Sequence, residues 1–152
     1  MWFVSVPGTE MLSPSEAEMI VGIGTDLLDV ARMERELGRD GAGFRDDVFT
    51  PGEAAYCEGM EHPARHFAAR FAAKEAFWKA VGSGPETVAL KDVEVGKGDA
   101  GRPRLVLHGS ARGAADRLGV TGAFVSLTHT AALASASVVL ERGPESEDRR
   151  DG

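Results

Sequence analysis

The chain lacks the features that mark several large classes of protein. Its 152 residues include a single cysteine, Cys57, so no intrachain disulfide can form, and such sparing use of cysteine is typical of the reducing cytosol. No apolar run approaches the roughly 20 residues that a membrane-spanning helix needs. No basic residue precedes the short apolar stretch Trp2–Val6, which argues against a secretory signal. We therefore expect a cytoplasmic protein with no membrane partner.

The sequence is equally poor in familiar catalytic motifs. Its four histidines and its cysteine do not have the spacing of a zinc site. It has neither a G-x-S-x-G nucleophile elbow nor a Walker loop. Gly22 and Gly24 begin a dinucleotide-binding fingerprint that stops short, because Leu27 holds the place of the third glycine. These absences give no support to zinc, serine-hydrolase or Rossmann-type chemistry.

Negative charge is concentrated at the two ends of the chain. The formal net charge is −7, but residues 1–18 carry −3 and residues 143–152 carry −2, which leaves −2 for residues 19–142. Neither end has a sustained hydrophobic period. We therefore predict an N-terminal extension over 1–18, a single domain over 19–142 and a disordered acidic tail over 143–152. The overall acidity argues against nucleic acid as a partner.

Hydrophobic patterns in the central part alternate between strands and helices. The apolar run over 20–25, interrupted by glycines, is typical of a buried strand. After Asp29, the residues Val30, Met33 and Leu37 have the spacing of an amphipathic helix, which the glycines that follow interrupt.

Capping signals mark two further helices. Thr50, Pro51 and Glu53 have the N-cap, first-turn and capping-box positions of a short helix over 51–59. The longest helix covers 64–81 and is closed by glycines. The other predicted elements are a hairpin with strands over 87–95 and 104–108, a helix over 110–118, and two strands over 123–128 and 134–140. The fold class is therefore α+β, with a small, mostly antiparallel sheet packed with a long central helix.

The long helix contains one candidate functional carboxylate. At about 100° per residue, Glu75 falls between an aromatic stripe that includes Phe71 and Trp78 and a basic edge that includes Lys79. One interpretation is a solvent-exposed ion pair between Glu75 and Lys79, at i,i+4. The other is a functional carboxylate, and helical spacing does not decide between them.

A second acidic candidate, Asp26, directly follows the first predicted strand. Asp26 could cap the following helix, or it could serve a site at the strand end, where Gly22 and Gly24 would let a ligand approach the backbone. His129 lies in the predicted turn between the last two strands, where a satisfied hydrogen bond is the simplest interpretation.

Several ordered motifs resemble one enzyme family. The segment 22–29 (GIGTDLLD) and the segment 70–80 (RFAAKEAFWKA) are similar to the 4′-phosphopantetheinyl transferases, and in particular to the short holo-acyl-carrier-protein synthase group. The segments 82–84, 101–105 and 125–130 match in the same order. The resemblance covers residues 19–142, whereas both ends lack a counterpart.

The resemblance implies a reaction and a metal. The family transfers the phosphopantetheine arm of coenzyme A to a serine of an acyl carrier protein and releases adenosine 3′,5′-bisphosphate. Attack on a pyrophosphate requires a hard cation and positive side chains. By the resemblance, Asp26 and Glu75 hold Mg²⁺, Lys79 meets the pyrophosphate, and these three residues are catalytic. The group that accepts the serine proton is left open between Glu75 and a metal-bound water.

The resemblance also implies contacts with coenzyme A and with the carrier protein. The expected coenzyme A contacts are Arg70, Lys74, Lys79, Gly82, Ser83, Gly84, Thr128 and His129, with Lys74 on the far side of the aromatic stripe. Arg32, Arg35 and Arg39 share one helix face, which is either a solvated surface or a docking surface for an acidic carrier. The resemblance favours docking, and it implies a homotrimer in which Glu75 and His129 of different subunits serve one coenzyme A. A non-catalytic module that binds coenzyme A or a carrier is the alternative, and the choice between fatty-acid and polyketide carriers stays open.

Overall fold

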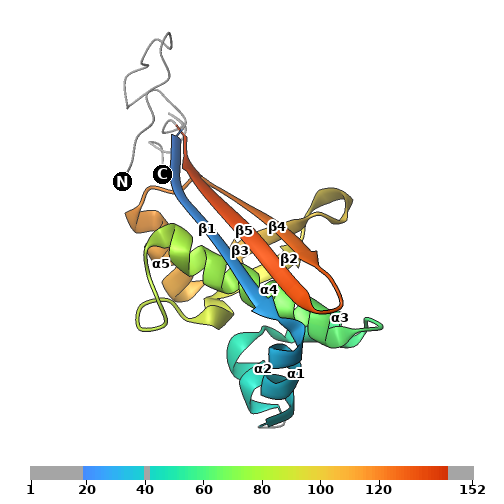
Figure 1. Cartoon of the computed structure of the whole chain (residues 1–152). Helices are drawn as coiled ribbons and strands as arrows, with labels where there is room; N and C mark the ends of the chain where they lie inside the picture. Colours follow the sequence, from blue (N-terminus) through green and yellow to red (C-terminus); the bar gives the residue numbers. More distant parts are fainter. Residues whose placement is uncertain (1–18, 40–41, 144–152) are drawn as a thin grey trace.

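A long central helix packed against a three-stranded sheet organises the fold. The computed structural model describes residues 19–39 and 42–143, so the predicted extension over 1–18 and nearly all of the predicted tail over 143–152 lie outside the described residues. Figure 1 shows the helix, α4 (Pro63–Val81), lying along one face of the sheet. The predicted α+β class and the central helix are confirmed.

The three long strands form an antiparallel sheet with two free edges. The strands are β1 (Met19–Asp29), β4 (Gly122–His129) and β5 (Leu133–Arg142), in the order β1-β5-β4. In their register, Asp26 on one edge strand and Leu127 on the other both lie opposite Ala136 of the middle strand. The two edges are therefore separated by the width of β5.

Only one face of this sheet is covered. On β5 the buried side chains alternate along the strand and face α4. The opposite face exposes large apolar side chains, with relative exposures of 68% for Ile20, 70% for Ile23, 63% for Leu27 and 55% for Phe124. The prediction of a buried strand over 20–25 is therefore only half right. Gly22 and Gly24 face the helix, and the isoleucines between and before them point outward.

Helix α4 is enclosed on almost every side. Eleven of its 19 residues are buried, including the charged Arg70 and Lys74. The sheet covers one side of the helix, and the smaller helices and a hairpin cover the other. A helix in this position has no broad solvent face, so the single aromatic stripe drawn from the sequence underestimates its buried surface.

Three short helices close the N-terminal end of α4. The predicted helices α1 (Val30–Arg39) and α3 (Pro51–Glu58) are present, and Thr50 caps α3 with the expected reciprocal capping box. A further helix, α2 (Gly43–Val48), forms where glycines were expected to leave a loop. Its Val48 side chain is buried in the core, which stabilises the helix despite the glycine at its start.

A hairpin and one more helix pack against the remaining side of α4. The predicted hairpin is confirmed as β2 (Val93–Lys97) paired antiparallel with β3 (Pro103–Leu107), and it forms a separate two-stranded sheet. Its first strand begins later than predicted, because a 3₁₀ turn (Leu90–Asp92) precedes it. The helix α5 (Gly109–Arg117) follows the hairpin. Among the described helices, none is long and apolar enough to cross a membrane.

Candidate active site

Asp26 lies within β1 and faces α4. The strand continues to Asp29, so Asp26 is not the residue after the strand that the sequence predicts. The capping alternative is wrong, because α1 begins at Val30, whose N–H donates to the carbonyl of Ala132. The carboxylate of Asp26 accepts instead from Lys79 Nζ, with 3.1 Å between Oδ1 and Nζ, and only 11% of its side chain is exposed.

Lys79 joins the long helix to the edge strand. Its ammonium also donates to the carbonyl of Thr25 at 2.8 Å, and 57% of its side chain remains exposed. Among the described residues no ion pair links Lys79 to Glu75, so the simple i,i+4 pair on a solvated surface is not what forms. Lys79 therefore crosslinks α4 to the backbone and side chain of β1 beside solvent.

Glu75 lies one helical turn before Lys79 and close to Asp26. Burial raises the pKa of Glu75, and the Asp26 carboxylate raises it further, while the positive charges of Arg32 and Lys79 oppose these effects. The second oxygen of Asp26, Oδ2, is buried and has no hydrogen-bond partner. Two adjacent carboxylates with an unpartnered buried oxygen fit a hard cation, because Mg²⁺ takes oxygen ligands and uses one or two carboxylates together with substrate phosphates.

The glycines before Asp26 serve helix packing and leave no room for a ligand. A Cβ added to Gly22 would lie 2.0 Å from the carbonyl oxygen of Ala80, and one added to Gly24 would lie 1.9 Å from that of Ala76. The backbone of α4 occupies the space that we expected a ligand to use. The expectation is wrong for this reason.

Lys74 lies in the interior and does not face the Asp26 carboxylate. Its side chain has no exposed surface, and Nζ donates to Glu53 Oε2 at 2.9 Å, to the carbonyl of Leu90 at 3.1 Å and to that of Val93 at 2.6 Å. An ammonium has three N–H donors, and all three are used. The predicted contact with coenzyme A therefore does not fit the position of Lys74.

A second polar cluster surrounds Arg70. Its guanidinium lies 4.2 Å from the centre of the Tyr56 ring, and its Nε is buried without a hydrogen-bond partner. The rings of His66 and His129 are 5.0 Å apart, edge to face. Burial lowers the pKa of His66, and the neighbouring His129 and Arg70 lower it further. These four side chains and Lys97 line a cavity of about 220 Å³.

The remaining predicted contacts fall in different places. Gly82 has a φ of 70° and ends α4, and the N–H of Ser83 donates to the carbonyl of Trp78, so the 82–84 loop leaves the helix one turn after Trp78. His129 is the last residue of β4, opposite Ala134, and does not lie in the turn. Because successive strand residues face opposite sides of a sheet, Thr128 points away from the face that carries His129. The structure thus brings Asp26, Glu75 and Lys79 together and leaves Arg70 and His129 in the second cluster.

Comparison with known proteins identifies the family. A family model for the 4′-phosphopantetheinyl transferase superfamily matches residues 22–134. The chain belongs to this superfamily. It is similar to the holo-[acyl-carrier-protein] synthase of Solibacter usitatus, with 48% identity over 124 residues that cover 81% of this chain and 99% of that protein. The synthase of Geobacter sulfurreducens is 45% identical over 125 residues, which cover 82% of this chain and 99% of that one.

Solved structures of the same family share the fold. The holo-[acyl-carrier-protein] synthase of Neisseria meningitidis superimposes with a TM-score of 0.74 at 31% identity, covering 82% of this chain and 100% of that one. The Bacillus anthracis synthase, solved in complex with coenzyme A (3′,5′-ADP), has a TM-score of 0.68 at 34% identity and covers 82% and 99%. The family resemblance read from the sequence is therefore confirmed.

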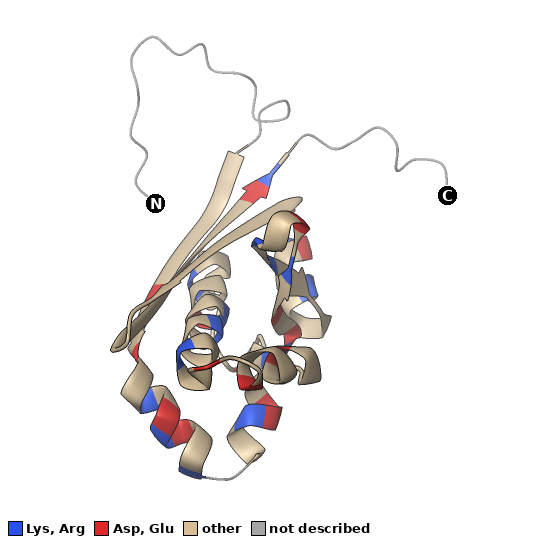
Figure 2. Ribbon diagram, turned by 90° about the vertical axis from the view of Figure 1, so that its right-hand side faces the viewer, with Lys and Arg blue, Asp and Glu red and all other residues tan. Residues whose placement is uncertain are grey.

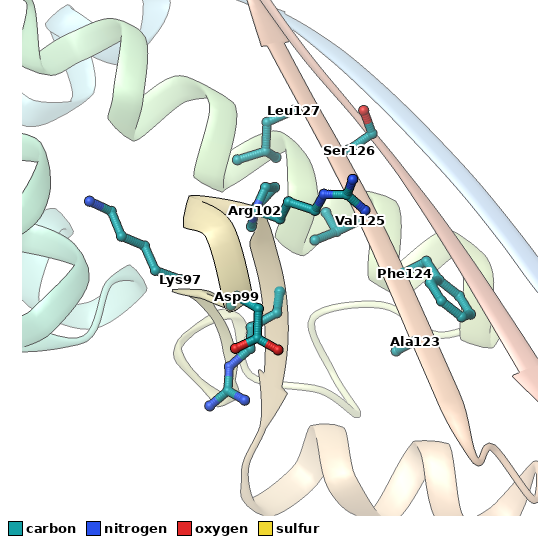
Figure 3. Close-up of a pocket in the computed structure, with 11 residues that line it drawn as sticks. Lys97, Asp99, Arg102, Ala123, Phe124, Val125, Ser126 and Leu127 are labelled. Atoms are coloured by element: carbon teal, nitrogen blue, oxygen red, sulfur yellow. The ribbon is translucent and has the colours of Figure 1, made fainter.

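The structure also reveals a large basic cavity that the sequence motifs did not single out as a site. A cavity of about 900 Å³ lies between the β2–β3 hairpin and β4, and its charged lining residues are Lys97, Asp99, Arg102 and Arg104 (Figure 3). It shares Lys97 and other lining residues with the cavity beside Arg70. The sequence signal that could have located this cavity is the pair of arginines on either side of Pro103, which belong to the family-like motif over 101–105.

The predicted docking arginines all lie on α1. Arg32, Arg35 and Arg39 are exposed, and Arg39 lies 3.6 Å from Glu36 on the same helix. Figure 2 shows that α1 carries basic and acidic residues together. Arg32 is close enough to Glu75 to oppose the rise in its pKa. The helix that carries these arginines therefore reaches the carboxylate pair.

Proposed function

We propose that this enzyme transfers the phosphopantetheine arm of coenzyme A to a serine hydroxyl of an apo acyl carrier protein, with Mg²⁺ as cofactor and adenosine 3′,5′-bisphosphate as the released product. The observation that carries the proposal is the Asp26–Glu75 pair, with the unpartnered Oδ2 of Asp26 beside the exposed ammonium of Lys79. Curated relatives named as holo-[acyl-carrier-protein] synthases support the reaction class.

The chain's own residues supply the binding and the proton transfer. Asp26 and Glu75 would hold Mg²⁺, which when bound neutralises the charge that develops on the pyrophosphate. Lys79 has a long, exposed side chain that can exchange its contact with Asp26 for a phosphate oxygen. Glu75 is also a candidate to accept the serine proton, because a general base must lie within hydrogen-bond reach of the reacting hydroxyl.

Two isosteric variants test the assignment. We expect Asp26→Asn and Glu75→Gln to remain folded and to lose transfer, measured as the mass gained by apo carrier protein incubated with coenzyme A and Mg²⁺. The exposed Asp116→Asn on α5 is the matched control. Wild-type transfer in either site variant would contradict the roles given to these carboxylates. Coenzyme A binding by calorimetry without any mass gain on several carriers would favour the non-catalytic alternative.

We further propose a homotrimer in which each site is shared between subunits. The apolar outer face of the three-stranded sheet, with Ile23, Leu27 and Phe124 more than half exposed, supports burial against other copies. Among the described residues no hydrogen bond or ion pair joins Asp26 or Lys79 to Arg70 or His129, although by this proposal a single coenzyme A needs both groups.

Complementation tests the shared site. Arg70→Met and Glu75→Gln each remove one half of the site. We expect both variants to be inactive alone, whereas a co-expressed mixture regains part of the transfer activity, because some sites then combine two intact halves. Light scattering measures the oligomeric state in parallel. A monomer, or a mixed oligomer with no regained activity, would rule out the shared site.

The carrier surface and the compartment complete the proposal. We propose that Arg32, Arg35 and Arg39 bind an acidic carrier protein, and their exposure along α1 supports this.

The free thiol of Cys57 is fully buried, which raises its pKa to about 12. Unpaired thiols are typical of proteins in the reducing cytoplasm, and we propose that the enzyme works there.

A further inference from the structure

The edge strand β1 approaches α4 more closely than any side chain would allow. Figure 1 shows β1 running across the central helix. An added Cβ would lie 1.9 Å from the Ala76 carbonyl oxygen at Gly24 and 2.0 Å from the Ala80 carbonyl oxygen at Gly22, where ordinary contact begins at 3.4 Å. These carbonyls are fixed by the helical backbone, so they cannot rotate away. A larger residue at Gly24 must therefore move the strand and the helix apart by about 1.5 Å.

The two contact points lie beside the functional groups. Ala76 directly follows Glu75, and Ala80 directly follows Lys79. Gly24 and Asp26 are two residues apart on one strand, so both face α4. Lys79 Nζ reaches β1 at 2.8 Å and 3.1 Å, and a separation of the two elements by more than an ångström takes both contacts beyond hydrogen-bond distance unless the lysine side chain extends to follow.

We propose that Gly24 is a positioning residue, which holds β1 against α4 so that the carboxylates of Asp26 and Glu75 face one metal ion at the correct separation. Gly22 makes the same close approach one strand repeat further from Asp26, beside the register irregularity between Ile20 and Gly22. Its influence on the carboxylates is therefore weaker. This inference rests on the proposed function, because it assigns a geometric requirement to that same site.

Three alanine variants separate positioning from simple packing. Gly24→Ala and Gly22→Ala introduce the same clash at different distances from Asp26, and Gly113→Ala on α5 is the control, because its added Cβ would meet only the end of the Arg117 side chain at 3.5 Å. For each we would measure the thermal midpoint, kcat and KM for transfer, and the affinity for Mn²⁺ by electron paramagnetic resonance.

We expect a graded loss at the site. Misplacement by about 1 Å can reduce a rate by about 100-fold, so Gly24→Ala should lose about 100-fold in kcat and Gly22→Ala about 10-fold. The affinity for Mn²⁺ should fall in the same order, and Gly113→Ala should match the wild type in kcat, KM and Mn²⁺ affinity, with a somewhat higher thermal midpoint because alanine is the better helix former. If Gly24→Ala does not fold, Gly22→Ala decides, because weakened Mn²⁺ binding in that folded variant supports positioning and unchanged binding overturns it.

Other results would overturn the inference. One such result is a wild-type kcat and Mn²⁺ affinity in Gly24→Ala. Another is a loss of kcat and Mn²⁺ affinity that is equal in Gly24→Ala and Gly22→Ala and parallels only the fall in their thermal midpoints. Failure of the proposed function has a different signature, since the wild type itself would then neither transfer the arm nor bind Mn²⁺.

Discussion

Replacing the buried Lys74 by methionine should destabilise the protein strongly. Lys74 and Glu53 have no exposed side-chain surface, and their 2.9 Å ion pair is the only charge partner that Glu53 has among the described residues. Methionine preserves most of the side-chain volume but leaves a buried carboxylate uncompensated, which costs about 3–5 kcal/mol. At about 2–4 °C per kcal/mol for a chain of this size, the thermal midpoint should fall by about 6–20 °C.

Lys79 provides the matched comparison on the same helix. Its side chain is 57% exposed, and exposed ion pairs contribute only about 0–1 kcal/mol. Lys79→Met should therefore unfold within about 2–4 °C of the wild type. It should nevertheless lose transfer activity, because its ammonium is the positive group beside the two carboxylates. Thermal unfolding followed by circular dichroism, together with the mass assay on apo carrier, measures both effects.

A double variant tests the physical cause. In Lys74→Met/Glu53→Gln both charges of the buried pair are removed together, so neither is left uncompensated, and the glutamine oxygen can still accept from the N–H of Val95, as Glu53 Oε1 does at 2.8 Å. We therefore expect it to recover part of the lost midpoint. The reasoning is refuted if Lys74→Met unfolds like the wild type and instead binds coenzyme A more weakly, since Lys74 would then be the cofactor contact that the sequence predicts.

Three further predictions concern charge. Folding raises the pKa of Glu75. A carboxyl with a raised pKa stabilises the native state at pH values below its unfolded pKa, and this contribution is lost as the pH rises through the folded pKa. Glu75→Gln should therefore be more stable than the wild type at about pH 8 and indistinguishable from it at about pH 4. In histidine NMR titrations His66 should titrate below 6.5, and His129→Asn should raise its pKa. Arg35→Glu should raise the KM for carrier protein and weaken its salt dependence at unchanged kcat, whereas Arg117→Glu on α5 should not.

Local signals in the sequence predict local structure well. The capping box at Thr50 and the glycine after α4 depend only on neighbouring residues, and both helices begin and end within one residue of their predicted bounds. The hairpin likewise follows from its turn. The α2 helix is missed because its stability comes from burying Val48 among residues distant in sequence, which no local pattern records.

The candidate site, like the fold, is predictable from the sequence only in part. The resemblance names Asp26, Glu75 and Lys79, and the structure places these three together, although the roles themselves remain proposals. The partner of Lys74 could not be found from spacing, because Glu53 lies on another helix and already satisfies a local capping pattern. One side chain thus serves a cap that the sequence shows and an ion pair that only the fold creates.

The arrangement of strands bears on the proposed sharing of the site between subunits. Asp26 is on β1 and His129 is on β4, the two edges of the sheet, and two strand spacings of about 4.8 Å separate them. Helix α4 fills the space between these edges on the face where both side chains lie, and its residues there, such as Ala72 and Ala73, are fully buried. The direct path from the carboxylates at one edge to Arg70 and His129 at the other is therefore occupied by the core. In the proposed homotrimer, the β1 edge of one copy against the β4 edge of another would remove this obstacle, and it would account for residues proposed for one reaction lying on opposite edges of a single sheet.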